Sequence, residues 1–145
     1  MTERIVPCVG AVILDDQDRV LLVKHVPEKE GFWAGKYICP GGRLDLGESL
    51  EDGVRREVRE ETGLEIRILQ WVRPLERIIR DSDGSLLDHI VYLDVVAKVT
   101  QGDFEPASDV GEGTWFTKED LTRIRAEIHE DTQRLLTEAG LLPKL

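Results

Sequence analysis

The chain has 145 residues, of which 41% are hydrophobic and 33% are charged, a composition typical of a globular protein and here of one domain, residues 1–145. The net charge of −10, without a basic cluster, argues against binding a nucleic-acid polymer but not a small phosphorylated substrate, because bound cations can invert the local field. No apolar run approaches the roughly 20 residues of a membrane span, and Cys8 and Cys39 without a secretory leader predict a reducing, cytoplasmic location.

The first predicted elements are two strands. Residues 5–14 (IVPCVGAVIL) and 20–26 (VLLVKHV) are rich in β-branched side chains, and the sequence DDQDR between them is typical of a turn. These features predict a β-hairpin. His25 stands near the end of the second strand, where we expect a structural role, with a place near a substrate pocket as the alternative.

A loop at residues 27–35 carries Trp33 and leads into Pro40-Gly41-Gly42. The Trp33 ring either stacks on a base or ribose ring or packs over the edge of the sheet, and the sequence leaves both readings open. Glycine lets the backbone approach a ligand closely, so the carbonyl group of Gly41 can take part in metal binding.

Residues 50–62 are predicted to form a helix. Ser49 is a typical N-cap residue, and Asp52 three positions later fits a capping-box pattern. Gly63 stands where a helix commonly ends in a left-handed residue.

Three carboxylates share one face of this helix. At about 100° per residue, Glu57, Glu60 and Glu61 fall within an arc of about 100°, and Glu61 lies inside the apolar stripe that ought to be buried. Carboxylates crowded at the edge of a core repel one another and lose hydration, and a bound cation removes that cost. Oxygen ligands favour Mg²⁺ or Mn²⁺ over zinc, and Gly53 would leave room for a ligand. The alternative is a merely solvated acidic helix.

The second half of the chain continues with strand-like segments at residues 65–74, 75–80 and 88–100, the last of them predicted to be central in the sheet. A polar loop at residues 101–113 holds Asp109 and Glu112. One closing helix is predicted from residue 117 to residue 139, because apolar residues recur at helical spacing. The pattern predicts an α/β (α+β) fold with a mixed sheet covered by helices on both faces.

Residues 42–64 (GRLDLGESLEDGVRREVREETGL) resemble the signature box of the Nudix hydrolases at every defining position. Gly42 is followed after five residues by Glu48, and after seven more by the sequence REVREETGL, residues 56–64. The resemblance implies an α/β/α sandwich. It also implies hydrolysis of a nucleoside diphosphate linked to another group, X.

The resemblance further implies catalytic roles for the acidic residues. Glu57, Glu60 and Glu61, with the Gly41 carbonyl group, would hold Mg²⁺ ions that neutralise the diphosphate and activate the attacking water. Glu57 would take the proton from that water, or else a loop carboxylate such as Glu112, which could also complete the metal site.

Two further residues of the box are expected to support the site. Glu48 would act through a metal-bound water or a contact behind the metal ligands. Arg56 would orient the glutamates through an i,i+4 pair with Glu60.

Within the family, the short chain and the FWAGKYICPGG segment look most like the mutator-type nucleoside triphosphate pyrophosphohydrolases. The alternatives are a pyrophosphatase for ADP-ribose or another nucleotide sugar, and a Nudix-fold sensor that binds a nucleotide without cutting it. The expected partner is a small nucleotide. Dimerisation is common among relatives, but nothing in the sequence displays an interface.

Overall fold

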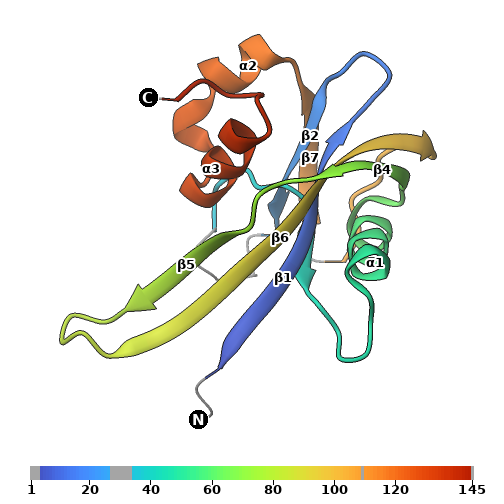
Figure 1. The fold of residues 1–145 in the computed structure, drawn as a ribbon. Helices are drawn as coiled ribbons and strands as arrows, with labels where there is room; N and C mark the ends of the chain where they lie inside the picture. Colours follow the sequence, from blue (N-terminus) through green and yellow to red (C-terminus); the bar gives the residue numbers. More distant parts are fainter. Residues whose placement is uncertain (1–3, 27–33, 109, 145) are drawn as a thin grey trace.

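A computed structural model describes residues 4–26, 34–108 and 110–144 of the chain. A mixed β-sheet forms the middle layer, with helix α1 (Leu50–Thr62) on one face and helices α2 (Lys118–Arg123) and α3 (Glu130–Glu138) on the other (Figure 1). This arrangement confirms the predicted fold class. The strands are β1 (Ile5–Leu14), β2 (Val20–His25), β3 (Gly41–Arg43), β4 (Glu65–Trp71), β5 (Leu75–Arg80), β6 (Leu86–Gln101) and β7 (Val110–Phe116).

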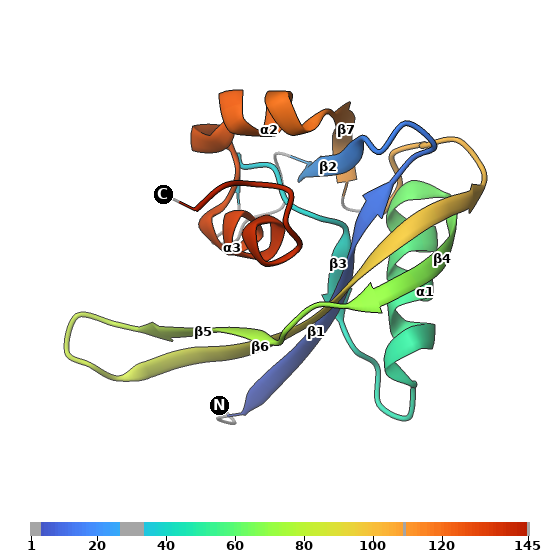
Figure 2. The ribbon, with the colours of Figure 1, turned by 45° about the horizontal axis from the view of Figure 1, so that its top comes forward.

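Within the described residues the sheet has seven strands in the order β4-β6-β1-β2-β7, with β3 paired to β1 and β5 paired to β6. Strands β1 and β6 run parallel, whereas β4 and β5 pair with β6 in antiparallel fashion. Strand β6 therefore has neighbours along both edges, which confirms its predicted central place. The hairpin of β5 and β6 projects beyond the helices (Figure 2).

The predicted N-terminal hairpin is confirmed. Strands β1 and β2 are antiparallel, and Leu14 pairs with Val20. The Asp15 carboxylate closes the turn by accepting hydrogen bonds from the backbone N–H groups of Gln17 (2.9 Å) and Arg19 (2.8 Å). The first acidic residue of the turn sequence therefore stabilises the turn by accepting backbone hydrogen bonds.

Helix α1 has the bounds that its sequence predicts. The Ser49 hydroxyl accepts a hydrogen bond from the Asp52 N–H group, and Gly63 ends the helix at a φ of 75° with its N–H group donating to the Arg59 carbonyl. Val54 and Val58 are fully buried in the core cluster that also contains Val9 of β1. One face of α1 is thereby fixed against the sheet, and the direction of its glutamates is fixed with it.

The expectation for Gly53 is wrong. A Cβ atom at Gly53 would lie 2.7 Å from the Leu44 side chain, 3.0 Å from a Glu48 oxygen and 3.2 Å from the Val9 side chain. Gly53 is therefore a packing glycine where α1 meets β1 and the loop before it. The room that it leaves is filled by protein.

The single closing helix is also corrected. The segment forms α2, a short 3₁₀ turn at Arg125–Glu127, and then α3, whose N-cap is His129. The break follows from pairing with a distant segment, because the Tyr37 N–H group donates to the Glu127 carbonyl and the His129 N–H group donates to the Tyr37 carbonyl. The apolar residues of the predicted stripe are nonetheless buried, namely Leu121, Ile124, Ile128 and Leu135.

The predicted polar loop at residues 101–113 is shorter in the structure. Strand β6 continues to Gln101, and β7 starts at Val110, where it pairs with β2.

Among the described helices none has both the length and the apolar character needed to cross a membrane.

Candidate active site

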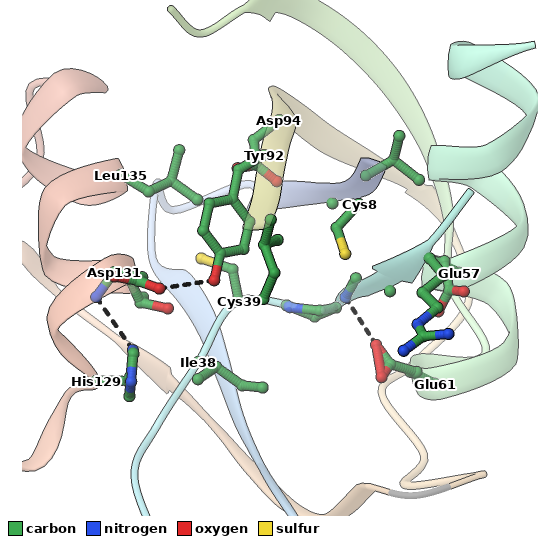
Figure 3. Close-up of a pocket in the computed structure, with 18 of the residues that line it drawn as sticks. Cys8, Ile38, Cys39, Glu57, Glu61, Tyr92, Asp94, His129, Asp131 and Leu135 are labelled. Carbon is green, nitrogen blue, oxygen red and sulfur yellow. Dashed lines mark hydrogen bonds between the residues drawn. The ribbon is translucent and has the colours of Figure 1, made fainter. Parts of the chain in front are cut away.

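A cavity with a volume of about 680 Å³ lies between α1 and α3 and is lined by residues of β1, β3 and β6 (Figure 3). Glu57, Glu60 and Glu61 of α1 line it together with Gly41 and Gly42 of β3, and we call this part the acidic end. The opposite part, which we call the α3 end, is lined by Cys39, Tyr92, Asp94, Asp131, Thr132 and Leu135. The three glutamates singled out in the sequence thus line one cavity.

Arg56 is the centre of a hydrogen-bond network at the acidic end. One of its terminal nitrogens donates to Glu57 Oε1 (2.9 Å) and to Glu60 Oε2 (3.2 Å), so the expected contact with Glu60 is present. Its Nε atom donates to Glu48 Oε2 (2.7 Å), and its other terminal nitrogen donates to Glu48 Oε1 (3.0 Å) and to the Arg43 carbonyl (3.0 Å). The guanidinium group therefore links α1 to β3 and to the loop between them.

Glu48 is held by this network from the loop before α1. The hydrogen bonds from Arg56 and from the Asp45 N–H group lower the pKa of the Glu48 carboxyl to about 2. Glu48 therefore stays ionised across the physiological range. Its two oxygens are occupied by protein donors, which places it behind the glutamates that line the cavity.

Glu57 lies against Gly42, where the β3 backbone comes close to α1. A Cβ atom at Gly42 would stand 2.7 Å from both carboxylate oxygens of Glu57, so only glycine leaves this carboxylate in place. The Glu57 side chain is 13% exposed. Loss of hydration raises the pKa of Glu57, Arg56 opposes that shift, and the neighbouring Glu60 adds to it.

Glu61 is the most buried of the three glutamates, with its side chain 6% exposed. Its Oε1 atom accepts a hydrogen bond from the Gly41 N–H group (2.8 Å), and its Oε2 atom lies 3.7 Å from His25 Nε2. The buried position of Glu61 in the apolar stripe is thus accommodated by β3 and by the end of β2. The second reading of His25, near the pocket, fits this placement.

The donor chemistry of the acidic end suits a hard divalent cation, because it consists of carboxylate oxygens and backbone groups. In the ranges that the structure describes, no group of three or more His, Cys, Asp or Glu side chains already has a metal-binding arrangement. The Arg56 guanidinium group instead contacts both Glu57 and Glu60 and supplies positive charge there. The residues fit a cation, because the three glutamates line the cavity beside the backbone of Gly41.

One predicted site residue, Glu112, is not brought to the cavity. Glu112 is exposed on β7, where it pairs with Lys24, and it is not among the residues that line the cavity. Its assignment as metal ligand or base stays a prediction. Trp33 and Asp109 lie outside the described residues.

The α3 end contains polar residues that the sequence reading did not select. The Tyr92 hydroxyl donates to Asp131 Oδ2 (2.6 Å), Arg77 of β5 donates to Asp131 Oδ1 (3.0 Å), and His129 Nδ1 accepts from the Asp131 N–H group (3.1 Å). This network joins α3 to the projecting hairpin. Its members come from distant segments, so the sequence held no local signal for it.

Asp94 is the other residue that the sequence reading missed. It is 9% exposed, and loss of hydration raises its pKa to about 7. A signal was available, because Asp94 interrupts the otherwise apolar run YLDVVA of a predicted central strand.

The chain is similar to known proteins over most of its length. A family model described as the NUDIX domain matches residues 4–138. The MutT NUDIX hydrolase from Burkholderia pseudomallei has a similar structure, with a TM-score of 0.77 and 26% identity, over 94% of this chain and 98% of that chain.

Two named relatives differ in the substrate that their names give. The ADP-ribose pyrophosphatase of Methanocaldococcus jannaschii is 28% identical over 112 residues, which span 77% of this chain and 62% of that protein. The nucleoside triphosphatase NudI of Enterobacter sp. is 29% identical over 147 residues, which span 98% of this chain and all (100%) of that protein. An uncharacterized hydrolase of the same family, YvcI of Bacillus subtilis, is 31% identical over 84% of this chain and 70% of its own length.

Proposed function

Because this chain belongs to the Nudix hydrolase family, we propose that it is a Mg²⁺-dependent pyrophosphohydrolase that cleaves a nucleoside diphosphate linked to a group X. The proposed substrate is a nucleoside triphosphate, cut to a monophosphate and pyrophosphate. The observation that carries the proposal is the meeting of Glu57, Glu60 and Glu61 at one end of a cavity large enough for a nucleotide.

Glu57, Glu60 and Glu61 would hold the cation, together with the Gly41 carbonyl group. When bound, a divalent cation neutralises diphosphate oxygens and lowers the pKa of water. The chain's own residues set the geometry. Arg56 fixes Glu57 from one side while Gly42 leaves space on the other, so the carboxylate has one defined place.

Glu57 is the proposed general base. Its Oε1 atom is hydrogen-bonded to Arg56, which leaves Oε2 to accept the proton of the attacking water. Partial burial raises the pKa of Glu57 and so makes it a stronger base than an exposed glutamate. Glu48 and Arg56 contribute by holding the glutamates.

Cleavage of ADP-ribose is the second candidate function. It is supported by the relative from Methanocaldococcus jannaschii, whose name gives that activity. Both reactions break a phosphoric anhydride, so the same glutamates would serve either substrate.

Three further expectations stay predictions. They are a cytoplasmic location, a single domain that extends over residues 1–145, and a homodimer.

Product analysis separates the two candidates. The protein is incubated with Mg²⁺ and separately with each nucleoside triphosphate, ADP-ribose, dinucleoside polyphosphates and nucleotide sugars. Monophosphate plus pyrophosphate from one triphosphate supports the main proposal. AMP plus ribose 5-phosphate from ADP-ribose supports the second candidate, and no cleavage of any compound contradicts both.

A further inference from the structure

Asp94 is a buried acidic residue that the proposed chemistry does not use. Its side chain lines the cavity from β6, and the residue is only 9% exposed. Among the described residues no hydrogen bond to its carboxyl group is found, and its backbone carbonyl accepts one from the Val72 N–H group. Burial of a carboxyl group without a partner is costly, so this placement requires an explanation.

The fold makes a specific space for this carboxyl group. Gly10 of β1 pairs with Asp94, and a Cβ atom at Gly10 would lie 2.8 Å from Asp94 Oδ1 and 2.7 Å from the Pro40 carbonyl oxygen. The carboxyl group thus lies over the bare backbone of Gly10. The Asp94 carboxyl group and the Gly10 backbone together form part of the cavity wall.

The surroundings of Asp94 suit a flat, largely apolar group with a polar edge. The α3 end presents the side chains of Leu135 and Cys39 beside Ile90, and its acids are Asp94 and Asp131, the second of which is paired with Arg77. Such a lining accepts a heterocyclic ring that has a polar edge. A nucleotide whose ring lies at the α3 end would place its phosphates at the acidic end of the same cavity, near Glu57.

We propose that Asp94 is a specificity-determining residue whose carboxyl group hydrogen-bonds the polar edge of a nucleobase seated in the α3 end of the cavity. The proposal rests on the proposed function and names the part of the substrate that is read there. A nucleobase edge carries a donor next to an acceptor, and a protonated carboxyl group offers the complementary acceptor and donor. Burial favours that protonated form, which is present near neutral pH.

The test compares Asp94→Asn with Asp94→Leu. Asparagine keeps one donor and one acceptor in nearly the same shape, whereas leucine keeps the branched skeleton, with bulkier methyl groups, and removes both. Val96→Ala, on the same face of β6 but not lining the cavity, controls for damage to packing. Calorimetry measures binding of the four common nucleoside monophosphates and of ribose 5-phosphate, which lacks a base.

We expect wild type to bind one monophosphate more tightly than ribose 5-phosphate. Asp94→Leu should weaken binding of that monophosphate by roughly 10- to 100-fold and leave ribose 5-phosphate unchanged. Asp94→Asn should stay within about threefold of wild type, as should Val96→Ala.

The outcomes separate this proposal from the proposed function, because monophosphate binding needs no turnover. Base-dependent binding that is lost only in Asp94→Leu supports the proposal even if no anhydride is cleaved. Unchanged binding by Asp94→Leu, or an equal loss in Asp94→Asn, overturns it even if wild type is an active hydrolase. Failure of wild type to bind any monophosphate better than ribose 5-phosphate overturns it as well.

Discussion

Gly42 shows at the scale of one residue how the backbone of β3 serves the acidic end. A methyl group at this position would meet the two oxygens of Glu57 at 2.7 Å, and these atoms belong to a side chain that can move away. We therefore predict that Gly42→Ala lowers kcat/KM by roughly 10- to 100-fold, as expected for displacement of one catalytic group. Thermal unfolding should change little.

Steady-state kinetics and a thermal scan of the same Gly42→Ala preparation check this prediction. Gly84→Ala is a control for a substitution outside the site, because the turn at Gly84 lies far along the β5–β6 hairpin and does not line the cavity. Its φ of 87° makes it costly for stability but not for catalysis. Full activity of Gly42→Ala would show that Glu57 does not need its observed position.

Asp94 makes the stability of the protein depend on pH. Burial raises its pKa from 3.8 to about 7. Below about pH 3.8 the Asp94 carboxyl group is protonated in both the folded and the unfolded protein. As the pH rises from 3.8 toward 7, the group ionises only in the unfolded protein, so the free energy of unfolding falls. Asparagine does not titrate. We predict that Asp94→Asn exceeds wild type in free energy of unfolding by roughly 1–4 kcal/mol at pH 8.

Urea unfolding at pH 4, 6 and 8 checks the pH prediction. The advantage of Asp94→Asn should shrink as the pH falls through this window and be nearly absent at pH 4. A constant difference at all three pH values would mean that Asp94 does not hold a proton in the folded state.

At the residue scale the sequence predicted the members of the Nudix box but not the α3 end. Arg56, Glu57 and Glu60 are near one another along one helix, so their contacts follow from helical spacing. Tyr92 and Asp131 are 39 positions apart, and only the fold brings them together. Asp94 required attention to an acid inside an apolar run.

Helix α1 is the element on which the acidic end depends, and its bounds were predictable because its caps are local. Gly53, in its interior, was misread because its role is set by Leu44 and Val9 of other segments. A Gly→Ala change in a helix gains about 1 kcal/mol from propensity alone. We predict that Gly53→Ala instead lowers the free energy of unfolding, by about 1–3 kcal/mol, because the added methyl group overpacks the contact with β1.

Chemical denaturation of Gly53→Ala checks the sign of this effect. Glu51→Ala, at an exposed position of the same helix, gives the matched case without a packing clash. Increased stability of Gly53→Ala would restore the first reading of this glycine as a position open to a ligand.

The C-terminal segment forms two helices where its apolar spacing predicted one. Its apolar spacing is regular, yet the helix breaks near Ile128 because the backbone there pairs with Tyr37. Periodicity identified the buried residues correctly. It could not show that a distant strand-like segment competes for the backbone hydrogen bonds.

At the level of the whole molecule, the cavity is formed between helix α1 on one side and helix α3 on the other. Helix α1 supplies the three glutamates and β3 the glycine backbone beside them, while α3 lies on the opposite side of the cavity and β6 contributes Tyr92 and Asp94 between them (Figure 3). The sheet and its two helical layers were predictable from strand-rich flanks around one helix. The path of the strands was not, because parallel pairing of β1 with β6 joins segments about 80 residues apart.

Mg²⁺ should stabilise the whole molecule through the acidic end. A cation at ten times its dissociation constant adds about 1.4 kcal/mol, which for a chain of this size raises Tm by about 3–6 °C. We predict this rise for wild type, measured by thermal scans with Mg²⁺ and with EDTA. The double variant Glu57→Gln/Glu60→Gln should not respond, and an equal rise in that variant would place the cation elsewhere.

The most direct measurement is the rate of anhydride cleavage by Glu60→Gln beside wild type and Glu51→Gln, on the best substrate from the panel and in Mg²⁺. Glu51 lies on the same helix, is exposed and does not line the cavity. We predict that Glu60→Gln loses about 100-fold or more in kcat with an unchanged Tm, whereas Glu51→Gln keeps the wild-type rate. Equal rates for all three proteins would contradict the assignment of catalysis to the α1 carboxylates.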